Sequence, residues 1–301
     1  MDVHSADDVA LAGEGAVTSG STAANVGKRL IILPATFAGG PRYMHKMYQN
    51  SMAIVRHYSK PDLFITMTCN PKWEEIRCEL LPGQQPADRP DLASRVFKLK
   101  LDALMQDLTK HSCLGRVVAH IHVVEFQKRG LPHAHILLIL SPDDKLRSPE
   151  DYDKVVCAEL PDPDTEKELF DVVSTCMMHG PCGERYPNAP CMVHGSCSKH
   201  YPREYCDETY ESADAYPVYR RRNDGRKVTV RHAVLDNRYV VPYNRALALR
   251  YRCHINVEVC ATVRSVKYLH KYVYKGPDRA AVQLQAPAAA APEAAPQPGR
   301  Q

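Results

Sequence analysis

The chain has 301 residues, of which 44% are hydrophobic and 25% are charged, as in an ordinary soluble globular protein. No apolar run approaches the roughly 18–20 residues of a membrane span, and the first residues show no secretory signal, which argues against membrane and secreted classes. The net charge of +4 permits nucleic-acid binding without demanding it.

Composition divides the chain into three parts. Residues 1–29 are rich in small residues without any period, and we predict that they are disordered. The tail at 277–301 is rich in Ala and Pro and cannot form a packed core. The folded domain is therefore expected at 30–276.

Within that domain, helical and strand patterns alternate. Apolar residues between Met44 and Val55 recur at helical spacing, which predicts a helix over 39–57. A strand at 62–68 and a loop at 80–90 follow. The later predicted elements are a helix at 91–110, strands at 116–127 and 133–140, helices at 149–158 and 165–177, a Cys/His-rich loop at 179–206, short strands at about 217–221, 227–232, 238–241 and 253–258, and a final helix at about 262–274. This order predicts an α/β (α+β) domain with a largely antiparallel sheet and an insertion between its halves.

The helix at 91–110 is the longest predicted element. Asp91 is expected to cap its N-terminus. Its apolar stripe, which is expected to face the core, consists of Val96, Leu99, Leu101, Leu104, Met105 and Leu108.

Two histidines in a predicted strand form the most informative pattern. His133 and His135 are two residues apart, so both imidazoles project from one face of the strand. Glu125 lies on the preceding strand with Gln127 on the same side, and either could reach the same point across a short hairpin. Two histidines and a carboxylate leave coordination positions open for a phosphate or water. The pattern predicts a metal site at His133, His135 and Glu125, with Gln127 competing for the third position.

A second pair, His120 and His122, has the same spacing. Strand alternation places this pair on the face opposite to Glu125, and we therefore favour His133 and His135. Taken alone, either pair is equally consistent with histidines that only pack within a sheet.

Tyrosines four residues apart lie in the final predicted helix. Tyr268 and Tyr272 share one helix face, and each hydroxyl is a candidate nucleophile for a phosphodiester. Because tyrosine has a pKa near 10, such a nucleophile needs a polarised phosphate or a nearby base. Lys271 and Lys275 could stabilise charge on the transferring phosphate. Tyrosines also commonly line helix–sheet interfaces, so the pattern by itself is weak.

A Cys/His-rich loop offers a second metal site. His179, Cys182, Cys191 and Cys197 supply four Zn²⁺ ligands within nineteen residues, and a Cys₃His set is a common structural arrangement. The residues that could replace one member are His194, His200, Cys176 and Cys206. Metal binding would supply folding energy to a loop with little apolar surface, so this insertion, at about 176–206, is predicted to bind structural zinc.

Basic residues cluster after this loop. Arg220, Arg221 and Arg222 are consecutive, and with Lys275 they are the candidate DNA-binding residues. A solvated surface is the alternative interpretation of such a run.

Several segments resemble the Rep domain, the nuclease module at the N-terminus of Helitron transposases. The matching stretches are GGPRYMHKMYQNSMAIVRHYSKPDLFITMTCNP (39–71), VVEFQKRGLPHAHILL (123–138), MHGPCG (178–183), CMVHGSCSKHYP (191–202), VVPYNRALALRY (240–251) and HINVEVCATVRSVKYLHKYVYKG (254–276). They occur in the expected order over nearly all of 39–276.

The resemblance implies an HUH endonuclease with a palm-like antiparallel sheet. It implies that His133 and His135 bind Mg²⁺ or Mn²⁺ and that Tyr268 and Tyr272 are nucleophiles. The implied substrate is single-stranded DNA of transposon ends, which is nicked to give a 5′-phosphotyrosine and then rejoined. The strand at Phe64–Thr68 is expected beside the site.

The chain contains no Walker A sequence, and a helicase supplied by another chain is an expected partner. A nuclear location follows only from the DNA substrate. Two alternatives remain open at this stage, namely a zinc-stabilised DNA-binding module that no longer cuts and a hydrolase that activates water instead of tyrosine.

Overall fold

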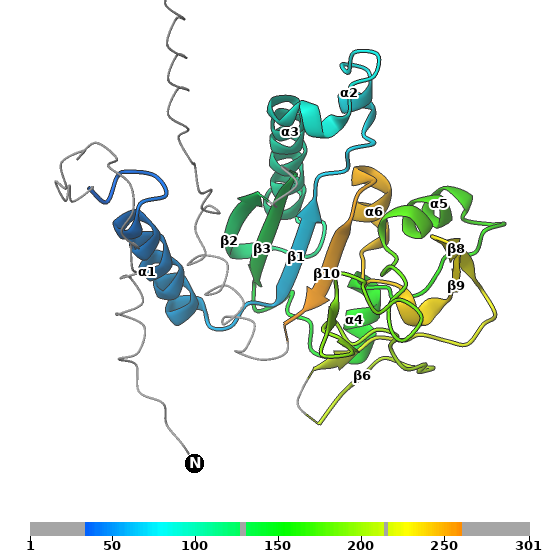
Figure 1. Cartoon of the computed structure of the whole chain (residues 1–301). Coiled ribbons are helices and arrows are strands. Elements are labelled where there is room, and N and C mark those ends of the chain that lie inside the picture. Colours follow the sequence, from blue (N-terminus) through cyan, green and yellow to red (C-terminus); the bar gives the residue numbers. More distant parts are fainter. Residues whose placement is uncertain (1–33, 127–130, 214–215, 261–301) are drawn as a thin grey trace, which may run out of the picture.

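The computed structural model describes residues 34–126, 131–213 and 216–260 (Figure 1). Its helices are α1 (Pro41–Tyr58), α2 (Glu74–Arg77), α3 (Pro90–Thr109), α4 (Pro149–Val155), α5 (Lys167–Cys176) and α6 (Arg245–Tyr251), with short 3-10 helices at Pro86–Asp88 and Asn237–Tyr239. Its strands are β1 (Leu63–Thr68), β2 (Val117–Phe126), β3 (Pro132–Leu140), β4 (Met192–Val193), β5 (Ser196–Cys197), β6 (Tyr210–Glu211), β7 (Pro217–Val218), β8 (Val228–Val230), β9 (Ala233–Leu235) and β10 (Ile255–Val259). The predicted termini at 1–29 and 277–301 and the final helix lie outside these ranges.

A four-stranded antiparallel sheet is the centre of the fold. Its strand order is β10-β1-β3-β2, so the last described strand pairs with the first. The chain returns to β10 only after the long segment that holds α4, α5 and the small hairpins, which lies at one side of the sheet (Figure 1). The predicted α+β fold with a largely antiparallel sheet is therefore confirmed.

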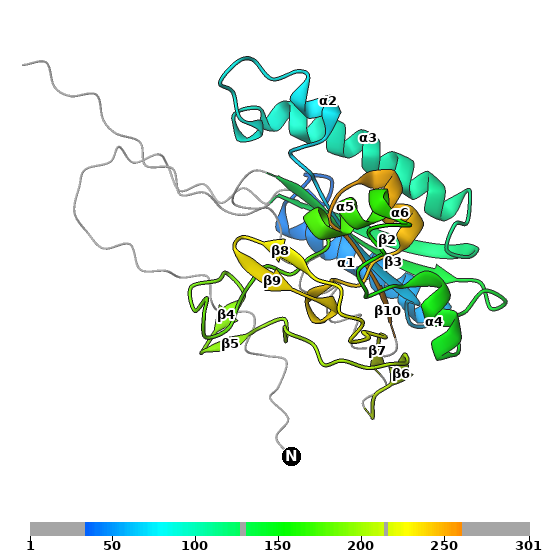
Figure 2. The same ribbon diagram turned by 90° about the vertical axis from the view of Figure 1, so that its right-hand side faces the viewer.

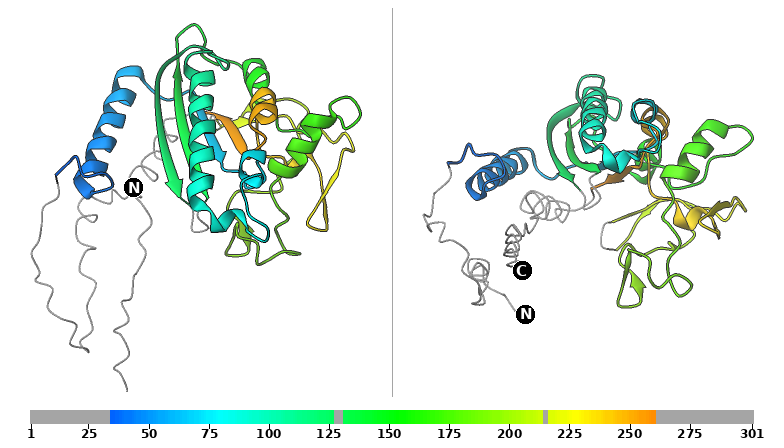
Figure 3. Two further views of the ribbon diagram at one scale, coloured as in Figure 1. Left: turned by 90° about the horizontal axis from the view of Figure 1, so that it is seen from above. Right: turned by 45° about the horizontal axis from the view of Figure 1, so that its top comes forward.

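Strand alternation gives this sheet two different faces. Leu63, Ile65 and Met67 of β1 are fully buried in the main core, together with the side chains that α3 turns toward them. The opposite face is partly covered by α1, and Figure 3 shows α1 and α3 on opposite sides of the sheet. Among the described residues, no helix is both long enough and apolar enough to cross a bilayer.

Two details of α3 differ from the prediction. Arg89, not Asp91, is the N-cap residue, and the Asp91 carboxylate accepts two hydrogen bonds from the Arg89 guanidinium at 3.0 Å. Leu99 is 70% exposed, although Leu101, Leu104 and Leu108 are buried. Leu99 lies on the far side of a helix that contacts the sheet along one stripe only, so its prediction as a core residue is wrong.

The inserted segment contains little regular structure. Three two-stranded hairpins, β4-β5, β6-β7 and β8-β9, lie beside one another with α4 at one end (Figure 2). The strand predicted at 238–241 is wrong, because the chain there forms a 3-10 helix. Helix α6 was not predicted, although Asn244 caps it by accepting a hydrogen bond from the backbone N–H of Leu247 at 3.1 Å.

Candidate metal centres and the basic segment

A polar row crosses the sheet where β1 ends and β3 begins. His133 is paired with Glu125 of β2 on one side and with Thr68 of β1 on the other. His135 lies next along β3, paired with Val123 and Thr66. Because directly paired residues on antiparallel strands point to the same face, the two imidazoles, the Glu125 carboxylate and both threonine hydroxyls share the face that α1 partly covers.

Hydrogen bonds orient both imidazoles. The Thr68 hydroxyl lies 2.7 Å from Nδ1 of His133, and the Thr66 hydroxyl lies 3.1 Å from Nδ1 of His135. A threonine oxygen can accept a hydrogen bond from the Nδ1–H group, and that tautomer leaves Nε2 unprotonated as a metal ligand. Nε2 of His135 is 3.8 Å from the Glu125 carboxylate.

The two rings lie in largely buried surroundings. His135 is 7% exposed, and the ring of Phe64 stacks on it with centroids 5.7 Å apart. Burial, followed by the neighbouring rings of His135 and His254, lowers the pKa of His133 to about 3. An imidazole with this pKa is uncharged near neutral pH, which is the form that binds metal ions.

The competing pair, His120 and His122, lies on the opposite face. These residues pair with Leu138 and Ile136, whose side chains belong to the main core. Their rings stack with centroids 5.9 Å apart, and burial lowers the pKa of both. The sheet therefore separates this pair from Glu125.

Five other candidate residues lie outside the described residues. They are Gln127, the alternative third ligand, together with Tyr268, Tyr272, Lys271 and Lys275. Their roles stay predictions that rest on the sequence.

The Cys/His-rich loop brings four ligand atoms together. Those of His179, Cys182, Cys191 and Cys197 all lie within 4.8 Å of one another. The hairpin of β4 and β5 turns at Gly195, whose φ of 80° is readily adopted by glycine. This hairpin brings Cys197 back to the others, with its Sγ 3.5 Å from Nε2 of His179. The cluster could hold a metal ion.

Contacts around this cluster support a buried metal. The ring of Tyr201 stacks on His179 with centroids 4.1 Å apart. Burial and the neighbouring thiols of Cys197 and Cys191 raise the pKa of Cys182 to about 12, whereas backbone and thiol hydrogen bonds outweigh burial and lower the pKa of Cys197. A bound cation would favour the thiolate form of all three cysteines. Cys206, a predicted substitute ligand, lies elsewhere and contacts the carbonyl of Tyr219 at 3.0 Å.

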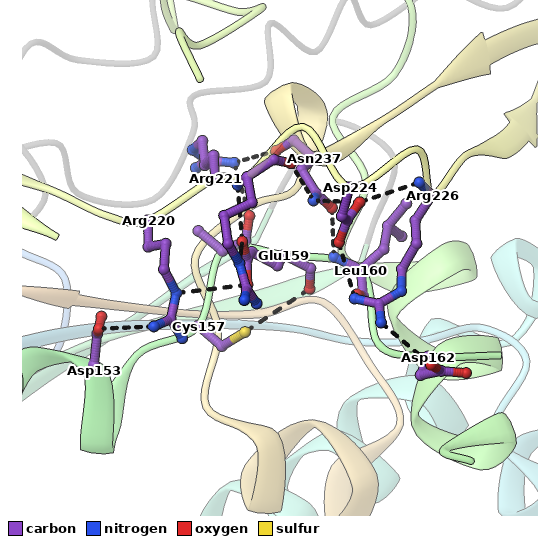
Figure 4. A network of polar contacts seen from close by, with 12 residues as sticks. Asp153, Cys157, Glu159, Leu160, Asp162, Arg220, Arg221, Asp224, Arg226 and Asn237 are labelled. Carbon is purple, nitrogen blue, oxygen red and sulfur yellow. Dashed lines mark hydrogen bonds and ion pairs between the residues drawn. The ribbon is translucent and has the colours of Figure 1, made fainter. Parts of the chain in front are cut away.

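The arginine run forms an internal network (Figure 4). Arg221 is 4% exposed, and its guanidinium donates hydrogen bonds to the backbone carbonyls of Ala158, Asn237 and Val240 at 3.2, 2.6 and 2.7 Å. A side chain held in this way is not available to contact DNA, which argues against the prediction that Arg221 binds DNA.

The neighbouring arginines pair with carboxylates. Arg222 binds Glu159 through two side-chain contacts of 2.8 and 2.6 Å, and Arg220 lies 3.6 Å from both Asp153 and Glu159. Arg226 pairs with Asp162 and Asp224. The charges of Arg220, Arg222 and Arg226 are thus at least partly neutralised, which weakens the prediction that Arg220 and Arg222 bind DNA.

A comparison with known families identifies the first part of the chain. Residues 3–138 match the family described as the Helitron helicase-like domain at the N-terminus. The chain carries a Helitron helicase-like N-terminal domain. This match includes α1, Glu125, His133 and His135, and it ends before the Cys/His cluster. No curated protein matches the chain.

Proposed function

We propose that this Helitron-related chain nicks single-stranded DNA and transfers the cut strand, as the nuclease–ligase domain of a rolling-circle transposase. The observation that carries the proposal is the polar row of Glu125, His133 and His135, which lies within the matched segment. The proposed DNA substrate would place the protein in the nucleus.

The donor set of this row suits a catalytic divalent cation such as Mg²⁺ or Mn²⁺. Nε2 of His133, Nε2 of His135 and the Glu125 carboxylate would hold the ion and leave positions open for phosphate oxygens. When bound, the ion would polarise the scissile phosphate. Thr66 and Thr68 fix the two rings, so the ligand nitrogens are preorganised.

Tyrosine is the proposed nucleophile in the cutting step. The oxygen of Tyr268 or Tyr272 bonds to phosphorus as the bond from phosphorus to the 3′ oxygen breaks. The phenol proton leaves the tyrosine, and the 3′ oxygen gains a proton. Since one phosphodiester replaces another, attack by a 3′ hydroxyl on the phosphotyrosine can rejoin DNA without a nucleotide cofactor. Lys271 is proposed to stabilise the transferring phosphate.

Zinc is the proposed ion at the four-residue cluster. Three thiols and one imidazole are a common structural zinc set. With four protein ligands this centre would have no open position for a substrate, so we assign it a structural role.

Covalent trapping tests the proposal. The purified chain is incubated with Mn²⁺ and labelled single-stranded oligonucleotides, and a denaturing gel is examined for a boiling-resistant protein–DNA adduct. We expect the adduct in wild type and its loss in His133→Ala, His135→Ala and the double variant Tyr268→Phe/Tyr272→Phe.

The hairpin provides a matched control. The double variant His120→Ala/His122→Ala removes two histidines with the same spacing from the opposite face of the sheet. This variant should still form the adduct. Cutting without an adduct would favour a hydrolase that activates water. DNA binding without cutting would favour an inactive DNA-binding remnant. Equal loss in both histidine pairs would indicate misfolding instead of chemistry and would remove the support that the polar row gives to the proposal.

A further inference from the structure

Helix α1 concentrates the positive charge of the chain. Residues 34–60 contain Arg42, Lys46, Arg56 and Lys60 and no acidic residue. The whole chain has 39 basic and 35 acidic residues, so outside this segment the two signs balance. The formal net charge of +4 therefore equals the charge of residues 34–60, which contain α1.

The charged residues of α1 share one exposed face. Arg42, Lys46 and Arg56 are exposed, as are the polar residues Gln49 and Asn50 between them. None of the three cations contacts a carboxylate of the described residues. Unpaired cations on an acid-free helix attract a polyanion, because binding releases the counterions that the polyanion had condensed.

The opposite face of α1 fixes the helix next to the polar row. Its apolar residues, which include Met47, Ile54 and Val55, pack on a small cluster with Ile121, Leu137 and Phe64 of the sheet. Phe64 also stacks on His135. The helix that carries the basic face therefore packs against Phe64, and Phe64 contacts the candidate metal ligand His135.

Aromatic rings flank the helix. Phe37, before its first turn, is 52% exposed, and Tyr58, its last residue, is 41% exposed. Exposed rings at the two ends of a basic helix suit single-stranded nucleic acid, whose bases stack on aromatic side chains while its phosphates meet the cations. The 18 residues of α1 span about 27 Å at 1.5 Å per residue, which is room for several nucleotides.

We propose that α1 is the surface that holds single-stranded DNA beside the candidate nuclease site, with Arg42, Lys46 and Arg56 on its phosphates. This inference rests on the proposed function for the identity of the ligand. It replaces the arginine run, in which Arg221 is buried and Arg220 and Arg222 face carboxylates, as the DNA-binding surface.

Binding without metal separates this proposal from the nuclease proposal. Fluorescence anisotropy of a labelled single-stranded oligonucleotide is measured in EDTA for wild type and for Arg42→Gln/Lys46→Gln/Arg56→Gln. The matched control is Arg95→Gln/Lys98→Gln/Lys110→Gln, which removes three exposed cations from α3 and its end on the opposite side of the sheet. Circular dichroism checks that all three proteins fold.

The α1 variant should bind between about 10-fold and 100-fold more weakly at 0.1 M salt, and the slope of log K against log salt should fall by about 2, since each phosphate contact to a single strand contributes about 0.7. The α3 variant should retain most of the wild-type affinity and slope. Equal loss in both variants, or an unchanged α1 variant, overturns the proposal, as does a wild type that prefers anionic vesicles, duplex DNA or RNA to single-stranded DNA. If α1 governs binding but no protein forms an adduct with Mn²⁺, the nuclease proposal fails and the binding surface stands.

Discussion

The two basic regions of this protein use positive charge in opposite ways. In the segment from Arg220 to Arg226, guanidinium groups bind carbonyls and carboxylates from distant parts of the chain. In α1, the cations face solvent without carboxylate partners among the described residues. The first region is the denser run in the sequence and the second is more dispersed. Charge density along a sequence is therefore a poor guide to a binding surface, because a charge that is already paired inside the fold has little left for a ligand.

Disrupting the proposed zinc site should produce the largest difference in amide hydrogen exchange between the two regions. Structural zinc contributes on the order of 10 kcal/mol in small zinc-binding domains. The cluster is linked to Arg221 through the 3-10 helix Asn237–Tyr239, because the N–H of His179 donates to the carbonyl of Tyr239 and Arg221 donates to the carbonyl of Asn237. We expect Cys182→Ser or Cys191→Ser to abolish zinc binding, measured by mass spectrometry of metal content, and to speed amide hydrogen exchange around Arg221 but not in α1.

The exposed cysteines provide the control for this experiment. Cys78 and Cys113 are free and exposed, so Cys78→Ser should keep the zinc. Full zinc content in Cys182→Ser would contradict the assignment of the cluster.

Loss of the buried Arg221 guanidinium should have the next largest effect, a decrease in the free energy of unfolding. Arg221→Met leaves three backbone carbonyls without the guanidinium that donates to them, and leaving buried acceptors without a donor destabilises a protein by about 1–3 kcal/mol. Urea unfolding should therefore show a clear fall in midpoint. A variant with normal stability and weakened DNA binding would return Arg221 to the DNA-binding surface.

Glu159 should make stability depend on pH. Burial raises the pKa of this carboxyl, but hydrogen bonds from Arg222 outweigh that effect and hold the pKa below its ordinary value. A lowered pKa means that the stabilisation is present above the ordinary carboxyl pKa and is lost as the pH falls through the folded-state value. Glu159→Gln should lower the unfolding free energy by about 1–2 kcal/mol near neutral pH, discounted for the half-exposed Arg222.

Thermal unfolding between neutral and acidic pH measures this prediction. The Glu159→Gln variant should lose less stability on acidification than wild type does. Parallel pH curves for the two proteins would show that the Glu159–Arg222 pair does not contribute.

Substitutions on α1 should have the smallest effect on stability. Arg42→Gln, Lys46→Gln and Arg56→Gln each remove an exposed cation without a carboxylate partner, and such surface changes usually alter the unfolding free energy by less than about 0.5 kcal/mol. Urea midpoints should match wild type. A large loss would mean that these side chains support the fold, and the contrast with Arg221 would disappear.

Local patterns gave reliable information about elements and ligand spacing. The alternation of His133 and His135 along a strand, and the position of Glu125 on the preceding strand, predicted that the three side chains share one face of the sheet. The register of β2 and β3 agrees, because it pairs Glu125 directly with His133. The ligands His179, Cys182, Cys191 and Cys197 lie within one short loop, so their spacing limited how far apart they could be. The threonines beside the histidines were missed, because Thr66 and Thr68 are more than sixty residues away and only strand pairing brings them close.

The α+β composition, the two histidines on one strand face and the cluster of zinc-type ligands could be predicted from the sequence, because each depends on the periodicity or spacing of neighbouring residues. The availability of each cation could not be predicted, since the Arg221 guanidinium is held by carbonyls of Ala158, Asn237 and Val240 from other segments. The exposure of Leu99 also follows from tertiary packing, because a helix that packs on a sheet buries only one stripe. Burial and ion pairing depend on contacts between residues far apart in the chain, and no local pattern encodes them.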